Sequence, residues 1–396
     1  MKILDILPSA NPQLGGPAEV VRQRGHYLLH IGHTVEVLTL DDPHADFVRD
    51  YPLPIHALGP SKSGYGYNRR LVPWLESHAH EFDAVVVEGL WQYPGLATWR
   101  ALRHSPVPYF VFTHGMLDPW FKRRYPLKHL KKWLYWPWAE YRVLRDAAAT
   151  LFTCEQERLL ARQSFWLYRL RERVVAFGTS DPPGEANRLR EHFVTRFPEL
   201  RGRRPLLFMG RIHEKKGCDL LIRAFARVAA VDPQLHLIMA GPDQTGWQAA
   251  LQKMASEGGV ADRICWSGML RDDLKWGALY SAEAFVLPSH QENFGLAVAE
   301  ALACGVPVLI SNKVNIWQEI ETDAAGLVAE DTVAGTESLL RRWLSLDAGQ
   351  RARLRGQAAR TFRTRFAMEA TAQDLIELIR TTRSPSADGK PAASGC

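Results

Sequence analysis

The sequence contains few cysteines, and none of them lies in a metal-binding pattern. The five that occur are scattered without the spacing of a zinc site or of a disulfide framework: Cys154, Cys218, Cys265, Cys304 and Cys396. There is also no Asp-any-Asp pair and no other metal-ligand cluster, so we expect neither a metal nor a bound cofactor. This cysteine usage is typical of a protein in a reducing cytoplasm.

Long apolar runs are absent as well. A membrane-spanning helix needs roughly 18–20 consecutive apolar residues, and no run here reaches that length. The first residues carry an acid at Asp5 and no small-residue cleavage pattern, so we interpret them as a first β-strand and not as a signal peptide. We therefore expect a cytoplasmic location, with at most a peripheral contact with the inner face of the cytoplasmic membrane.

The chain is basic but lacks the signatures of nucleic-acid binding. Its formal net charge is +6, yet no zinc-ligand pattern and no glycine-aromatic RNA-binding motif accompanies that charge. We expect no nucleic acid as partner. Anionic sugar nucleotides and anionic lipid surfaces fit the charge better.

The length and the apolar pattern predict two domains. A chain of 396 residues exceeds the roughly 250–300 residues that one core supports. Short buried strands alternate with helical segments, a pattern typical of parallel α/β sheets. We expect a first domain over 1–180 and a second over 205–365. The polar, Arg-rich stretch 181–204 that opens with Asp-Pro-Pro-Gly is the predicted linker, and the Ser-, Pro-, Ala- and Gly-rich end, 384–396, is expected to be disordered.

One stretch, Leu287 to Ile310, reads as strand, loop, helix and strand, with the helical run over Phe294–Ala303. From Phe294 to Ile310 the only charged residue is Glu300, and a buried carboxylate is costly unless it is hydrogen-bonded. Glu292 lies just before the helix, whose N-terminal amides favour an anion such as phosphate. Taken singly, each glutamate also fits a purely structural role. Glu292 could stabilise the N-terminus of the helix by its charge, and Glu300 could lie at an edge where its carboxylate reaches water.

Taken together, the two glutamates, with Phe-Gly between them, resemble the Glu, seven residues, Glu signature of retaining glycosyltransferases of the GT-B fold, family 4 type. The resemblance implies that Glu292 approaches the hydroxyls of a donor sugar and that Glu300 holds the ribose of its nucleotide. It also implies that the start of the helix meets the diphosphate, through Asn293, Phe294, Gly295 and Leu296.

Further donor-side residues follow from the same resemblance. Gly210-Arg211 followed by Lys216-Gly217, after the predicted strand Leu206–Met209, is similar to the family's pyrophosphate clamp, with Lys215 as a neighbour. In such a clamp both residues would neutralise the diphosphate, Arg211 through its planar, forked guanidinium and Lys216 as a point charge. Gly15 and Gly16 lie at a strand-to-helix turn where a ligand can approach the backbone, and Met269 and Leu270 would flank the base.

The first domain supplies the other candidates. A lone histidine is more often structural than catalytic, but the Thr-His-Gly context of His114 at a strand end resembles the family's histidine that faces the donor sugar. The string His-Gly-Met-Leu-Asp-Pro-Trp from His114 to Trp120 resembles a subgroup of bacterial surface-polysaccharide transferases. It makes Asp118 an acceptor-side candidate, together with Trp91. The chain departs from many relatives at Phe177–Ser180, where they have Pro-Asn-Gly.

A segment over 121–138 mixes lysines and arginines with aromatic residues. Such a mixture suits an interface with anionic lipid headgroups. It is equally typical of a solvated basic helix whose aromatic residues belong to the core.

The resemblance thus predicts an α/β protein of the GT-B fold, with two Rossmann-like doubly wound parallel-sheet domains facing a central cleft and a last helix, 366–382, packed back on the first domain. The implied activity is the retaining transfer of a sugar from a nucleotide-diphosphate sugar to a hydroxyl of a saccharide acceptor, for example a polyprenyl-linked one, in exopolysaccharide or lipopolysaccharide biosynthesis. The catalytic candidates are His114, Arg211, Lys216 and Glu292. Two alternatives stay open: a sugar-nucleotide epimerase of the same fold, and a catalytically silent membrane-associated scaffold.

Overall fold

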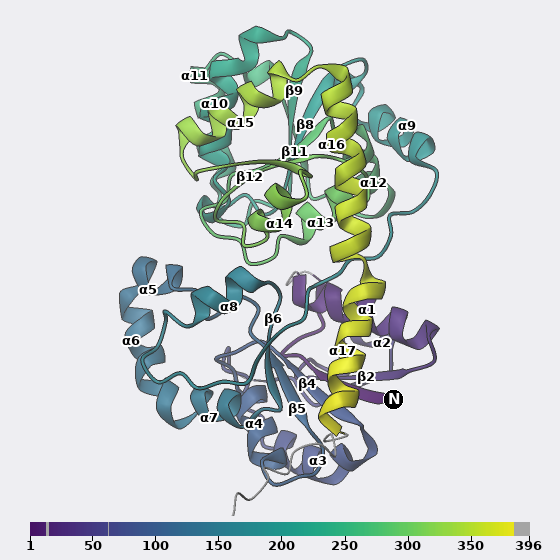
Figure 1. Ribbon diagram of the computed structural model, residues 1–396, viewed down its shortest axis with the longest axis vertical. Helices are drawn as coiled ribbons and strands as arrows, with labels where there is room; N and C mark the ends of the chain where they lie inside the picture. The colour runs from purple at the N-terminus through teal and green to yellow at the C-terminus, as the bar shows by residue number, and fades with distance from the viewer. Residues whose placement is uncertain (13–15, 62, 384–396) are drawn as a thin grey trace, which may run out of the picture. The chain divides into compact units, whose positions relative to one another are not determined.

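The computed structural model describes residues 1–12, 16–61 and 63–383. Two compact units divide the chain. Among the described residues, the first unit holds Met1–Phe177 and Met368–Arg383, and the second holds Gly178–Ala367. Each unit is built on its own parallel sheet flanked by helices (Figure 1). The prediction of two doubly wound α/β domains is therefore confirmed.

The sheet of the first unit has seven strands in the order β3-β2-β1-β4-β5-β6-β7. Its central strands read as continuous apolar runs because helices cover both faces. The order of the strands reverses between β1 and β4, which makes the loops after these two strands the borders of a ligand-binding crevice. The strands are β1 (Lys2–Ile6), β2 (Thr34–Thr39), β3 (Ile55–Ala57), β4 (Ala84–Glu88), β5 (Tyr109–Phe112), β6 (Ala149–Phe152) and β7 (Glu172–Val174).

The helices of the first unit include one from the far end of the sequence. Helix α17 (Met368–Arg383) packs against α1 (Gly16–His30), and Arg383 forms an ion pair with Asp83. The predicted return of the last helix to the first domain is thus confirmed. The others are α2 (Asp46–Arg49), α3 (Leu71–His78), α4 (Tyr93–Leu102), α5 (Trp120–Arg124), α6 (Pro126–Tyr135), α7 (Glu140–Asp146) and α8 (Glu155–Ala161).

The second unit repeats this architecture with six parallel strands in the order β10-β9-β8-β11-β12-β13. The order reverses between β8 and β11, which pair directly. The strands are β8 (Arg204–Met209), β9 (Leu235–Ala240), β10 (Ile264–Gly268), β11 (Ala284–Leu287), β12 (Val308–Ser311) and β13 (Gly326–Ala329). The helices are α9 (Ala186–Arg196), α10 (Cys218–Val228), α11 (Gln248–Glu257), α12 (Asp272–Ser281), α13 (Leu296–Ala303), α14 (Trp317–Thr322), α15 (Val333–Ser345) and α16 (Ala348–Thr361).

The segment predicted as a linker, 181–204, is instead part of the second unit. Its central part forms α9, which packs against α12 with Leu189 and Phe193 fully buried. The two helices meet at Gly277, where an added Cβ would lie 2.4 Å from the carbonyl oxygen of Leu189. The arginines that suggested a solvated linker lie on the exposed side of this helix, and its few apolar residues face inward.

The first sheet ends at β7, an edge strand, and its last residue, Val174, is 39% exposed for that reason. The predicted disordered tail, 384–396, lies outside the described residues. No helix among those that the structure describes combines the length and the apolar character needed to cross a membrane.

Candidate active site

In the second unit, the loops that follow β8 and β11 are locked together at the point where the strand order reverses. Gly217 adopts a left-handed φ of 65°, and a Cβ at this position would lie only 2.2 Å from the carbonyl oxygen of Pro288. The backbone N–H of His290 donates to the carbonyl of Lys215 across 2.9 Å. This close approach of two backbones requires the glycine, and it brings the side chains after Lys215 to the loop of Glu292.

Lys216 and Glu292 form an ion pair between these loops. The two side chains are 14% and 17% exposed, so the pair is largely shielded from water. Burial, Lys215 and Arg211 lower the pKa of Lys216, whereas the Glu292 carboxylate in contact with its ammonium group favours the charged form. The arrangement holds a cation at the carboxyl edge of the sheet, where an anionic ligand can take the place of the carboxylate.

The backbone around Glu292 is fixed on both sides. Its N–H donates to the carbonyl of Lys313 across 2.9 Å, and its carbonyl accepts from the N–H of Asn315 across 3.0 Å. Three residues later Gly295 has a φ of 78°, so α13 begins at Leu296 and not at Phe294 as predicted. The N–H groups of Val298 and Ala299 donate to the carbonyl of Gly295 across 2.7 and 3.2 Å. The earliest amides of a helix point out of its N-terminus, and in α13 that end adjoins the loop of Glu292.

Glu300 lies on α13 and is 5% exposed. Its Oε1 accepts from Nζ of Lys275, on α12, across 2.9 Å. Sequence reasoning missed Lys275. A buried carboxylate requires a partner, but nothing in the sequence selects this lysine among the 49 Lys and Arg residues.

The remaining donor-side candidates lie on the same sheet edge, and their predicted roles stay predictions. Arg211 follows β8 and is close enough to Lys216 to lower its pKa. Met269 and Leu270 follow the edge strand β10, and Met269 is 51% exposed.

Two further candidates lie just before α13. The ring of Phe294 is buried and packs edge-on against Phe366, with centroids 5.4 Å apart, so this side chain has a packing role. Asn293 accepts from Asn315 across 3.5 Å.

In the first unit, His114 contacts one end of a chain of three buried charged residues. Its Nε2 lies 2.6 Å from Oε2 of Glu88, the last residue of β4. The other oxygen of Glu88 accepts from Arg24 across 2.6 Å, and Arg24 also donates to Asp5 across 2.7 Å. Sequence reasoning did not find this network. Its only signals were an acid inside the apolar run of β1 and an acid at the end of β4.

The acceptor-side candidates make local contacts. The indole N–H of Trp91 donates to the carbonyl of Met116 across 3.2 Å, which ties the loop after β4 to the loop after β5. Asp118 is 8% exposed, and its carboxylate accepts from the N–H of Trp120 across 2.7 Å, at the start of α5. Gly16 opens α1 with no atom within 4 Å of an added Cβ, and Gly15 lies outside the described residues.

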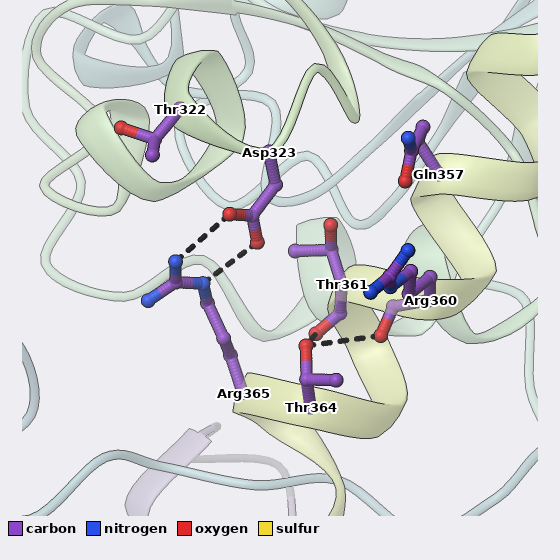
Figure 2. A pocket seen from close by; sticks show the side chains of 7 residues that line it. All are labelled: Thr322, Asp323, Gln357, Arg360, Thr361, Thr364 and Arg365. Atoms are coloured by element: carbon purple, nitrogen blue, oxygen red, sulfur yellow. Dashed lines mark hydrogen bonds and ion pairs between the residues drawn. The ribbon is translucent and has the colours of Figure 1, made fainter.

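A separate polar pocket lies near the end of α16 (Figure 2). Its main internal contact is the Arg365 guanidinium, which donates two hydrogen bonds to Asp323 across 2.7 and 2.8 Å. None of the predicted site residues lines it. The lining residues are Thr322, Asp323, Gln357, Arg360, Thr361, Thr364 and Arg365.

Within the part of the chain that the structure describes, no three His, Cys, Asp or Glu side chains gather as metal ligands would. The expectation that the protein needs no metal stays a prediction.

Both halves of the chain match family models. Residues 15–178 match "Glycosyl transferase 4-like domain" and residues 193–361 match "Glycosyl transferases group 1". Curated relatives include the D-inositol 3-phosphate glycosyltransferases of Thermomonospora curvata, 33% identical over 44% of this chain and 42% of that protein, and of Geodermatophilus obscurus, 35% identical over 37% and 35%. The chain thus spans about two fifths of the length of the curated relatives it matches.

Solved structures resemble nearly the whole chain. Sucrose-phosphate synthase from Thermosynechococcus elongatus has a TM-score of 0.76 at 20% identity and covers 96% of this chain and 98% of its own. HepE from Anabaena, in complex with UDP and glucose, has a TM-score of 0.74 at 18% identity and covers 96% and 100%. At these identities the likeness concerns the fold.

Proposed function

The chain belongs to the glycosyltransferases of the GT-B fold and the family 4 type, and on that basis we propose that it moves a sugar, with retention, from a nucleotide-diphosphate sugar to a hydroxyl of a saccharide acceptor. The observation that carries the proposal is the Lys216–Glu292 pair at the reversal of strand order in the second unit, beside Arg211 and the start of α13. This place combines cations, helix amides and a carboxylate, which a nucleotide sugar needs for its diphosphate and its hydroxyls.

The proposed chemistry breaks the bond between the sugar C1 and the diphosphate oxygen and forms a bond from C1 to the acceptor oxygen on the same face. The acceptor's hydroxyl proton passes to the departing diphosphate. Lys216 moves from Glu292 to the diphosphate, Arg211 adds a second cation, and Glu292 is left to accept from a sugar hydroxyl. We propose that these protein cations, and not a metal, take up the charge on the leaving group.

Glu300 is proposed to hold the ribose hydroxyls of the donor, with Lys275 compensating its buried charge. The solved HepE complex contains UDP, which favours UDP as the nucleotide. In this proposal, exopolysaccharide or lipopolysaccharide assembly on the inner face of the cytoplasmic membrane supplies a lipid-linked acceptor.

The test is to incubate the purified chain with UDP-, GDP- and ADP-glucose, with and without saccharide acceptors, and to measure free nucleotide diphosphate. We expect release from one of the three donors, and a faster release when an acceptor is present. An epimerase would change the sugar without releasing diphosphate, and a silent scaffold would leave the donor intact. Either result would contradict the proposal.

The basic-aromatic segment 121–138 is proposed to contact an anionic lipid surface. Helix α6 contains no buried residue, although three of its leucines recur at helical spacing and are 78%, 55% and 58% exposed: Leu127, Leu130 and Leu134. Trp133 and Trp138 are also exposed, whereas Trp136 is completely buried. Of these three tryptophans, only Trp136 therefore belongs to the core. An apolar stripe with lysines beside it is the pattern of an interfacial helix.

The triple variant Leu127→Glu, Leu130→Glu, Leu134→Glu is expected to lower binding to vesicles at least tenfold, because it removes the apolar stripe and adds repulsion from anionic headgroups. Binding is measured by co-sedimentation with vesicles of phosphatidylcholine and phosphatidylglycerol. The control is Val231→Glu, which changes an exposed apolar residue, 63% exposed, in the second unit. Equal binding of the triple variant and the control would remove the lipid contact from the proposal.

A further inference from the structure

The ring of His114 is held by one polar partner and two aromatic ones. Besides the contact of Nε2 with Glu88, the ring stacks on Phe112 with centroids 5.7 Å apart and lies 5.0 Å from the ring of Phe177. The side chain is 5% exposed. This enclosure leaves the imidazole little freedom to turn, so its two nitrogens have fixed and different surroundings.

The second nitrogen of this ring, Nδ1, is buried and has no hydrogen-bond partner among the residues that the structure describes. Leaving a buried polar atom unsatisfied costs about 1–3 kcal/mol, so such an atom calls for an explanation. A ligand that supplies the missing hydrogen bond provides one.

The backbone at His114 supports the same interpretation. His114 has a φ of 48°, a left-handed conformation that is rare for a residue with a side chain. A buried carboxylate, Glu157, keeps it there by accepting from Thr113 Oγ1 and from the N–H of Gly115. Strain of this kind gathers at functional sites, where surrounding contacts enforce it.

The charge on Glu88 decides which nitrogen of the histidine carries the proton. Burial alone would raise the pKa of Glu88, but Arg24 and His114 hold it below its ordinary value, so the group is a carboxylate. A carboxylate can only accept, and Nε2 of His114 must therefore be the protonated nitrogen. If the ring carries this one proton, its other nitrogen has a lone pair.

We propose that Glu88 is a positioning residue that fixes His114 as the Nε2–H tautomer, so that Nδ1 accepts a hydrogen bond from a hydroxyl of a bound saccharide. This inference rests on the proposed function and adds to it the direction of the hydrogen bond. The ring selects a ligand that can donate, such as a sugar hydroxyl, and rejects an analogue in which that hydroxyl is replaced by hydrogen or by an ether. Arg24 supports the arrangement because it keeps Glu88 charged.

The variant Glu88→Gln tests the tautomer directly. Arg24 carries only donors, so the carbonyl of the new amide must face Arg24 and its NH2 group must face Nε2 of His114. The amide would then donate where the carboxylate accepted, and the ring proton would move to Nδ1. We expect the 15N resonances of His114 to show protonated Nε2 in the wild-type chain and protonated Nδ1 in Glu88→Gln.

The matched control is Glu140→Gln, which replaces another buried glutamate of the same unit, 2% exposed, and should leave the His114 tautomer unchanged. Release of diphosphate from the donor is measured on the same samples. We expect kcat to fall at least 30-fold in Glu88→Gln, whereas the affinity for the free nucleotide diphosphate stays within a factor of two.

The two readouts separate the possible failures. A wild-type ring protonated at Nδ1, or a cationic ring at neutral pH, would overturn the tautomer assignment whether or not the chain transfers sugar. An inverted tautomer with unchanged kcat would overturn the role of Nδ1, and a lowered kcat without inversion would reduce Glu88 to a structural residue. Absence of any diphosphate release in the wild-type chain, with the tautomer as assigned, would count against the proposed function alone.

Discussion

Replacing Lys216 with alanine is expected to lower the rate of diphosphate release from the donor by about 10²–10³-fold, the usual loss when one group that stabilises developing charge is removed. Lys216 forms an ion pair with Glu292, and the proposed function puts the diphosphate of the donor against this lysine and the start of α13. Turnover is measured as nucleotide diphosphate released over time, at donor concentrations that separate kcat from KM.

The control for this variant is Lys253→Ala. Lys253 is 79% exposed on α11 and forms a surface ion pair with Glu257 at 3.8 Å, so its removal should change neither turnover nor folding. Circular dichroism must show that Lys216→Ala keeps its fold, since the variant leaves Glu292 without its partner. Undiminished turnover in a folded Lys216→Ala chain would remove this residue from the mechanism. A Lys216→Arg variant should recover only part of the rate, because the planar fork of arginine cannot replace a point charge at the same place.

The sequence was sufficient to predict the fold and the loops that form the candidate site. Apolar runs of strand length gave the parallel sheets, because strands covered by helices on both faces are apolar throughout. Glycines marked the strand ends, and at Gly217 the reason is visible, since only a residue without Cβ lets the loop after β8 touch the carbonyl of Pro288. The contact between Lys216 and Glu292 follows from loops whose strands are neighbours in the sheet.

What the sequence could not give is the choice of partner for each buried charge. Glu88 lies 64 positions from Arg24, and Glu300 lies 25 from Lys275. Such pairs depend on the final angle and rotation of each helix against its sheet, which no local pattern specifies. The candidate residues could therefore be named one by one, but the network that orients His114 appeared only in the folded chain.

The linker prediction was wrong for a related reason. The segment 186–196 contains three arginines and several other polar residues, and this composition obscures two inward-facing residues four positions apart, Leu189 and Phe193. Helical spacing of those two positions was the only available signal. A short amphipathic helix with a narrow apolar stripe is easily mistaken for a polar connection.

Replacing Phe193 with alanine is therefore expected to destabilise the second unit by about 3–5 kcal/mol, the range found when a large aromatic side chain is removed from a core. Phe193 is fully buried, and its Cβ would lie 2.7 Å from a Cβ placed at Gly277 on α12, so α9 has no space to move inward and fill the cavity. The change in the free energy of unfolding is measured by urea denaturation, with the fluorescence of the second unit's tryptophans as the signal.

The control is Phe197→Ala, one helical turn further along. Its ring lies 4.9 Å from that of Phe193 but is only partly buried, so its loss should cost less than half as much. A true linker would predict the opposite pattern, with both substitutions near zero, because a solvated connection buries neither ring. Equal and small changes in the free energy of unfolding would thus support the linker interpretation of 181–204. A much larger loss of stability for Phe193→Ala than for Phe197→Ala would show that α9 is an integral part of the second unit.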